Sequence, residues 1–173
     1  MHRLRPEAAT SLRLVDRTGG LLRDVPLPGH GRATWVHLAE VAPEVIFATL
    51  ASEDHHFYDH HGVDPKAVVR ALWLDARAGR VVSGASTVTM QLARLLEPKP
   101  RGLLAKLSEM LAALRIERAL SKEQILEQYL NRAYYGNGAY GIEQAALRYF
   151  GKPAKALGLG ESARRSVNPL QAG

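Results

Sequence analysis

From Pro43 onward, the apolar residues of this 173-residue chain recur with the period of an α-helix, in segments that begin and end at capping residues. Asp64, followed by proline, is typical of a helix start, and Gly79 is typical of the corresponding end. Residues 121–124 fit a capping box that opens a helix reaching Asn131. The fold class is therefore predicted to be mainly α.

Four further helices are expected on the same grounds, over 43–53, 86–97, 103–120 and 141–150, the second capped by Ser86. Helical periodicity also assigns their buried faces. In 86–97 the predicted core stripe is Val88, Leu92, Leu95 and Leu96, with Thr87, Gln91 and Arg94 on the opposite side. In 103–120 it is Leu103, Leu107, Met110, Leu111 and Leu114, with Lys106, Glu109, Ala113 and Glu117 opposite.

The first thirty residues follow a different pattern. Two short apolar stretches flank a glycine pair at 19–20, which predicts a small β-hairpin ahead of the helices. The chain is divided on this basis into an N-terminal approach with a short β-hairpin (1–35), a helical domain (36–163) and a divergent tail (164–173).

Composition and charge exclude several classes of function. The longest uncharged stretch, 81–93, is too short to span a bilayer, and no apolar segment follows the basic start as it would in a secretory signal. The absence of cysteine excludes a thiolate nucleophile. Residues 101–173 carry eleven Lys and Arg against six acidic residues, an excess that attracts phosphates. Because stacking aromatics are not interleaved with these cations, nucleic acid is not an expected partner.

Residues 53–62 hold three acids and four of the seven histidines. One interpretation is a metal site, because His56 and His60 are four residues apart, but no histidine follows residue 61. A second makes Glu53 a general acid or base, held at the end of an apolar helix whose neighbours make its carboxyl a weaker acid. The third is an exposed Glu-Asp pair without a chemical role.

A second group of polar residues lies at the start of the helix expected over 86–97. Thr87, Gln91 and Arg94 place a hydroxyl, an amide and a guanidinium on one face, near N–H groups that attract anions. A phosphate or a sugar hydroxyl is a natural partner, although an ordinary amphipathic helix has the same pattern. Lys106 and Glu109, one turn apart, supply either a further charged site or a surface ion pair.

Four motifs follow one another along the chain. They are Glu53-Asp54-x-x-Phe57-x-x-His60-x-Gly62, Gly84-x-Ser86-Thr87-Val88-Thr89-x-Gln91, Lys106-x-x-Glu109 and Lys122-x-x-Ile125-Leu126-Glu127-x-Tyr129-Leu130-Asn131. In this order and spacing they resemble the peptidoglycan glycosyltransferases, glycosyltransferase family 51, which form the transglycosylase domain of class A penicillin-binding proteins. The resemblance covers about 12–163, and the segment 89–96 is most similar to the 1C-type branch.

The resemblance implies a lysozyme-like helical lobe with a smaller membrane-apposed lobe. It also implies polymerisation of lipid II, with release of undecaprenyl diphosphate, at the outer (periplasmic) face of the bacterial cytoplasmic membrane. The implied partners are lipid II, the growing glycan strand and the membrane surface. Glu53 is the implied base and Glu109 a second catalytic carboxylate. No cofactor is required, although a divalent cation (Mg or Mn) can accompany the diphosphate. The implied substrate-binding residues are Asp54, Gly84, Ser86, Thr87, Gln91, Arg94, Lys106 and Lys122.

The chain departs from the family pattern at three places. Ala105 stands where the family often has arginine, and Arg94 stands where many members have lysine, which keeps the charge and adds a planar fork. After 163 the expected apolar continuation and a fifth motif are not found, so we expect a C-terminally truncated domain whose membrane anchor is absent.

Two alternative functions stay open. A lysozyme-like muramidase would use Glu53 as its general acid, and an inactive domain would only bind cell-wall precursor. A hydrolase of uncharged glycosidic bonds has no evident need for Arg94 and Lys106 beside its acids, which favours glycosyl transfer.

Overall fold

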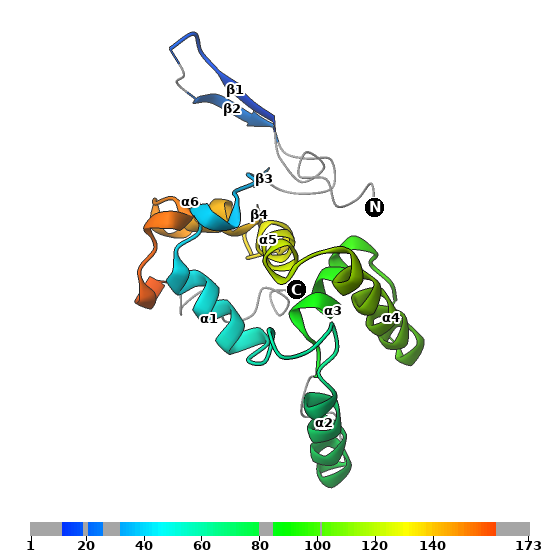
Figure 1. The fold of residues 1–173 in the computed structure, drawn as a ribbon. Coiled ribbons are helices and arrows are strands. Elements are labelled where there is room, and N and C mark those ends of the chain that lie inside the picture. Colours follow the sequence, from blue (N-terminus) through cyan, green and yellow to red (C-terminus); the bar gives the residue numbers. More distant parts are fainter. Residues whose placement is uncertain (1–11, 19–20, 26–31, 80–84, 101, 162–173) are drawn as a thin grey trace.

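The computed structural model describes residues 12–18, 21–25, 32–79, 85–100 and 102–161, and within these ranges most residues are helical (Figure 1). The prediction of a mainly α fold is therefore confirmed. The helices are α1 (Pro43–Glu53), α2 (Pro65–Ala78), α3 (Val88–Leu96), α4 (Leu103–Ala119), α5 (Lys122–Arg132) and α6 (Ile142–Phe150), with two short 3-10 turns, η3 (Leu38–Glu40) and η4 (Ala154–Ala156).

The core is built around α3 and α5. Helix α3 packs against both α4 and α5, and α5 also contacts α6. Fully burying one large apolar side chain stabilises a fold by roughly 1.5 to 3 kcal/mol, so these helices anchor the domain. The least exposed large side chains of this core are Phe57, Val88, Leu92, Ile125, Leu126, Tyr129 and Leu130.

The caps predicted for α2 are confirmed. The Asp64 carboxylate accepts the backbone N–H groups of Lys66 at 2.9 Å and Ala67 at 3.1 Å, and Gly79 ends the helix at a φ of 64°. Helix α2 projects from the body on the side away from the N-terminal hairpin (Figure 1). Its Val69 and Trp73 side chains are 68% and 60% exposed.

Helix α3 differs from its prediction in two respects. Its N-cap is Thr87, whose hydroxyl accepts the Met90 N–H at 3.2 Å, and the expected cap Ser86 precedes it. The helix is also buried on nearly all sides: every residue over 88–93 is buried, including Gln91 at 4% exposure. The predicted polar face thus points into the protein, because α1, α4 and α5 supply partners for its polar groups.

Helix α4 buries the face opposite to the one predicted. Glu109 and Ala113, assigned to the solvent side, are 8% and 0% exposed, whereas the predicted core residues Leu103 and Leu111 are 78% and 58% exposed. The cause is tertiary: Glu109 pairs with Arg94, and the backbone at Ala113 is approached closely by a glycine loop. The apolar periodicity of α4 predicts that its leucine face is buried, but the residues that α4 packs against lie on its other face.

The N-terminal hairpin is confirmed. Strands β1 (Leu12–Val15) and β2 (Leu21–Val25) pair antiparallel, while the glycine turn at 19–20 lies outside the described residues. A second, parallel pair joins β3 (Arg32–Ala33) to β4 (Ala139–Tyr140), which lies between α5 and α6. In the part of the chain that the structure describes, no helix is long and apolar enough to cross a membrane.

Candidate active site

Glu53 is the last residue of α1, and its side chain is half-buried. Gln91 of α3 donates its amide Nε2–H to Glu53 Oε2 at 2.9 Å. This is the one hydrogen bond that the described residues make to the Glu53 carboxylate, so Oε1 stays open. The structure therefore brings together two residues that the sequence analysis selected from different motifs.

Behind Gln91 lies Tyr129 of α5, whose hydroxyl donates to Gln91 Oε1 at 3.0 Å. Tyr129 is fully buried. Burial is the main cause that raises the pKa of Tyr129, and the neighbouring Tyr135 and Glu53 raise it further. The hydroxyl therefore keeps its proton at neutral pH and acts as a donor. Tyr129 was seen in the sequence only as a motif residue, with no role assigned.

Asp54 is placed inside the protein. Its side chain is 4% exposed, and its two oxygens lie 3.0 and 3.1 Å from His60 Nε2. Asp54 Oδ2 also accepts the Val88 N–H, at the start of α3, at 2.9 Å. Because the Gly62 N–H points at His60 Nδ1 at 3.2 Å, Nδ1 is the acceptor and Nε2–H donates to Asp54. Asp54 therefore ties the end of α1 to the start of α3.

Thr87 also holds the loop that contains His60 and Gly62. Its hydroxyl donates to the Gly62 carbonyl at 2.6 Å and accepts the Met90 N–H. Ser86, one residue earlier, accepts a hydrogen bond from Lys106 of α4. Gly84, also predicted to bind substrate, lies outside the described residues.

Arg94 and Lys106 lie on either side of the Glu109 carboxylate. Arg94 makes two hydrogen bonds to Glu109, while Lys106 Nζ is 3.8 Å from Glu109 Oε2. The hydrogen bond with Glu109 raises the pKa of Arg94, whereas burial lowers the pKa of Lys106 against the attraction of Glu109. The three side chains line a cavity of about 360 Å³ together with Lys99. One carboxylate among three cations makes this cavity suited to an anion.

A second cavity of about 200 Å³ opens beside Glu53. Residues from three parts of the chain line it, and its polar lining is mixed in charge. Its lining includes Glu53, His55, His56, Asp64, Arg70 and Ser86. Ser86 adjoins this cavity and also bonds Lys106 of the first one, so the anion-suited cavity and Glu53 are neighbours.

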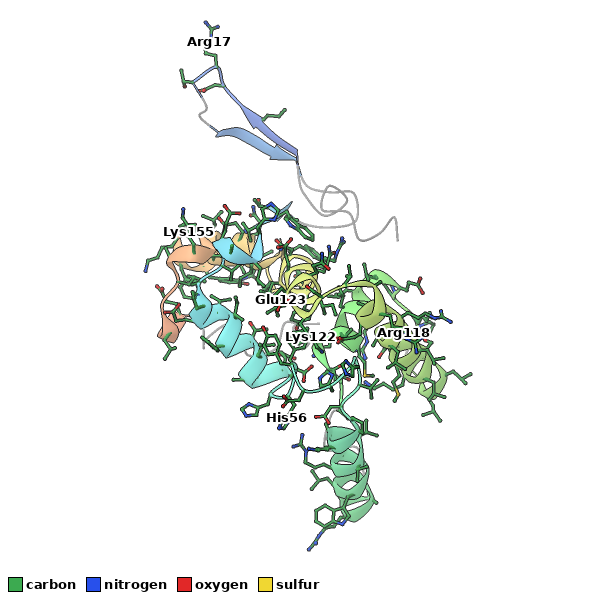
Figure 2. The ribbon with its side chains drawn as sticks, in the orientation of Figure 1. Arg17, His56, Arg118, Lys122, Glu123 and Lys155 are labelled. Atoms are coloured by element: carbon green, nitrogen blue, oxygen red, sulfur yellow. The ribbon has the colours of Figure 1, made fainter. Side chains whose placement is uncertain are left out.

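Lys122 begins α5 and lies beside α4 (Figure 2). Its ammonium donates to the His60 carbonyl at 2.6 Å and to Glu117 Oε1 at 2.8 Å, and it sits 4.4 Å from the centre of the Phe57 ring. Glu117 Oε1 also accepts the Thr89 hydroxyl at 2.7 Å. Two of the three N–H donors of Lys122 are therefore used within the protein.

The histidines that suggested a metal site have separate partners. His60 pairs with Asp54, whereas the exposed His56, just beyond the end of α1 (Figure 2), lies 3.6 Å from Asp64 Oδ2. Within the described ranges, no group of three or more His, Asp or Glu side chains is arranged to hold a metal ion.

Comparisons with known proteins match most of the chain. Residues 21–167 match the family model described as Transglycosylase. Penicillin-binding protein 1A of Aquifex aeolicus is 46% identical over 136 residues, which cover 78% of this chain and 19% of that protein. Penicillin-binding protein 1A of Escherichia coli is 46% identical over 137 residues (78% and 16%), and penicillin-binding protein 1C of the same organism is 43% identical over 134 residues (78% and 17%).

The chain belongs to the transglycosylase family and is a peptidoglycan glycosyltransferase domain of the kind found in penicillin-binding proteins. It spans about a fifth of the length of these relatives. Because 1A and 1C proteins match at similar identity, the comparisons do not single out the 1C branch. Family membership favours transfer over the hydrolysis that the carboxylates alone left open.

Proposed function

We propose that this chain polymerises lipid II into glycan strands with Glu53 as the general base. The observation that supports this most directly is the Glu53 carboxylate itself. One oxygen is held by Gln91, the other makes no hydrogen bond to a described residue, and a cavity adjoins the side chain. A general base must reach the proton that it abstracts, and a carboxylate held on one oxygen is oriented for that task.

In the proposed reaction, Glu53 takes the proton of the 4-hydroxyl of the acceptor sugar. The acceptor oxygen forms a bond to the anomeric carbon of the donor, with inversion, as the bond from that carbon to the diphosphate oxygen breaks. Undecaprenyl diphosphate leaves with the bonding electron pair. A general base contributes on the order of 10² to 10⁴ in rate, so further stabilisation is needed elsewhere.

Arg94 and Lys106 supply that stabilisation in this proposal. Both line the larger cavity, which Ser86 joins to the one beside Glu53, and negative charge develops on the diphosphate as it leaves. Glu109 contributes by holding the Arg94 guanidinium in one orientation. Lys106, beside Ser86, would contact the same diphosphate.

The side chains of this cavity do not form a ligand set for a metal ion, because its one acidic residue, Glu109, is already paired with Arg94. A divalent cation (Mg or Mn) would therefore arrive with the diphosphate, whose oxygens are the ligands that Mg prefers. No step assigned to the protein depends on it.

We also propose that the exposed leucines of α4 and the exposed apolar side chains of α2 face the outer surface of the bacterial cytoplasmic membrane. Leu103 and Leu104 are 78% and 83% exposed, and Trp73 of α2 is 60% exposed. Apolar groups gathered on one surface often mark a membrane contact. In this proposal α2 and the exposed side of α4 belong to the smaller, membrane-apposed lobe.

The glycosyltransferase domain then spans 36–163, with the hairpin as its approach, and the tail at 164–173 lies outside the described residues.

The test is incubation of the purified chain with labelled lipid II and detergent or vesicles, followed by separation of the glycan products. Long glycan supports the proposed transfer, whereas disaccharide released from preformed glycan in a parallel incubation indicates a muramidase. Unchanged lipid II that co-elutes with the protein indicates a domain that only binds precursor. The last two results would each overturn the proposal.

A further inference from the structure

Three side chains from three helices form a hydrogen-bond chain that runs from the core to Glu53. The Tyr129 hydroxyl of α5 donates to Gln91 Oε1 at 3.0 Å, and Gln91 Nε2 of α3 donates to Glu53 Oε2 at 2.9 Å. Tyr129 is fully buried and Gln91 is 4% exposed. Water therefore has little access to the inner part of the chain, where a hydrogen bond is stronger than in solvent.

Only one orientation of the Gln91 amide gives each donor an acceptor between Glu53 and Tyr129. An ionised carboxylate only accepts hydrogen bonds, so it selects the NH₂ end of the Gln91 amide. The amide oxygen must then face Tyr129, where the hydroxyl supplies the donor that a buried carbonyl needs. With the amide reversed, its oxygen would face Glu53 Oε2, and two acceptors would repel each other.

We propose that Tyr129 is a positioning residue that holds the Gln91 amide with its NH₂ toward Glu53, and that it thereby sets the basicity of Glu53. The inference rests on the proposed role of Glu53 as the base. Donation from the amide favours the charged carboxylate, which is the form that accepts a proton.

The same chain accommodates Glu53 after it has accepted the proton. The proton arrives at Oε1, so Oε2 stays an acceptor for the Gln91 Nε2–H and the amide keeps its orientation. No proton leaves Tyr129 in either state. Tyrosine suits this position because its hydroxyl donates to the amide oxygen in both states, whereas phenylalanine has no donor.

Other charged or titratable groups face Glu53 from the elements around it, and a change at Tyr129 leaves them in place. Within the described residues, none of them makes a hydrogen bond to the Glu53 carboxylate. A change in the titration of Glu53 therefore indicates a change at the Gln91 amide. These groups are Asp54, His55 and His56 after α1, Asp64 and Arg70 at α2, and Tyr135 after α5.

The test is Tyr129→Phe, which removes the hydroxyl and keeps the ring in the core. In protein labelled with carbon-13 at glutamate carboxyls, NMR follows the titration of Glu53, whose signal is assigned by its loss in Glu53→Gln. The expected result is a titration midpoint about one pH unit higher, a tenfold change in basicity. The acid limb of the pH profile of kcat/KM moves to higher pH by the same amount, because the base must be ionised.

The matched control is Tyr134→Phe, which removes a hydroxyl that accepts the Gly138 N–H at 3.2 Å, outside the chain to Glu53. We expect no shift of the Glu53 midpoint in this variant. Gln91→Leu should shift the midpoint as Tyr129→Phe does, and the double variant should shift it no further.

An unchanged Glu53 midpoint in Tyr129→Phe, or in Gln91→Leu, would overturn the inference. The NMR titration requires no turnover, so it separates this inference from the proposed function. A wild-type chain that makes no glycan would contradict the proposed function, while the titration would still show whether Tyr129 acts on Glu53.

Discussion

Arg94 and Glu109 are joined by two parallel hydrogen bonds across the contact of α3 with α4, from Nε to Oε1 at 2.7 Å and from Nη2 to Oε2 at 2.9 Å. A guanidinium has five N–H groups in a fixed fork, so three remain for an anion in the adjoining cavity. Glu109 is 8% exposed, and its position is set by the packing of α4. The pair therefore holds a positive charge in one orientation at that cavity.

Replacing Glu53 with glutamine should abolish most polymerisation and leave binding of lipid II within a few-fold. The amide keeps the shape of the side chain and loses its basicity. The measurement is the rate of glycan formation together with the Kd for labelled lipid II. A Glu53→Gln variant that polymerises at close to the wild-type rate would exclude Glu53 as the base.

Replacing Arg94 with glutamine should weaken binding of a diphosphate-bearing substrate by about 1.5 to 3 kcal/mol, the range for hydrogen bonds to charged groups. Arg94→Lys should recover part of this loss, because it keeps the charge without the fork. The control ligand is the same glycan without its diphosphate, whose affinity should not change. Equal affinity of the wild-type chain for both ligands would contradict the placement of the diphosphate at Arg94.

Replacing Lys122 with methionine should lower the free energy of unfolding by about 3 to 5 kcal/mol, because Glu117 would be left as a buried, unpaired carboxylate. The Glu117 side chain is 6% exposed. Denaturant unfolding measures the change. The matched control is Lys155→Met, at an exposed lysine near α6 (Figure 2), with an expected change within about 0.5 kcal/mol. If Lys122→Met kept full stability and lost affinity for lipid II, Lys122 would contact substrate instead.

Replacing Gly62 with alanine should destabilise the fold more than replacing Gly79 with alanine. Both glycines have positive φ, 91° and 64°, so both variants carry a similar backbone cost of about 1 to 2 kcal/mol. A Cβ at Gly62 would also lie 2.9 Å from the Ala113 carbonyl carbon, whereas nothing lies within 4 Å at Gly79. Overpacking adds about 1 to 3 kcal/mol. Equal losses of unfolding free energy in the two variants would show that α4 moves away from the added Cβ at no energetic cost.

The sequence by itself determined where most helices begin and end. Asp64 and Ser121 cap their helices through hydrogen bonds to backbone groups two or three residues away, as predicted. Such contacts are local, so their signal lies within a few positions of the chain. The order and spacing of the four motifs likewise identified the family before any geometry was known.

Only the tertiary structure decided which faces are buried and which side chains meet. Periodicity placed the leucines of α4 in the core, yet Glu109 and Ala113 are buried there, because Arg94 and the Gly62 loop come from distant segments. Asp54 and Lys122 were read as substrate-binding, and each is occupied by partners inside the protein. The contact from Tyr129 to Gln91 joins positions 38 residues apart. Pairings of this kind depend on how helices pack across the core, and no local pattern records them.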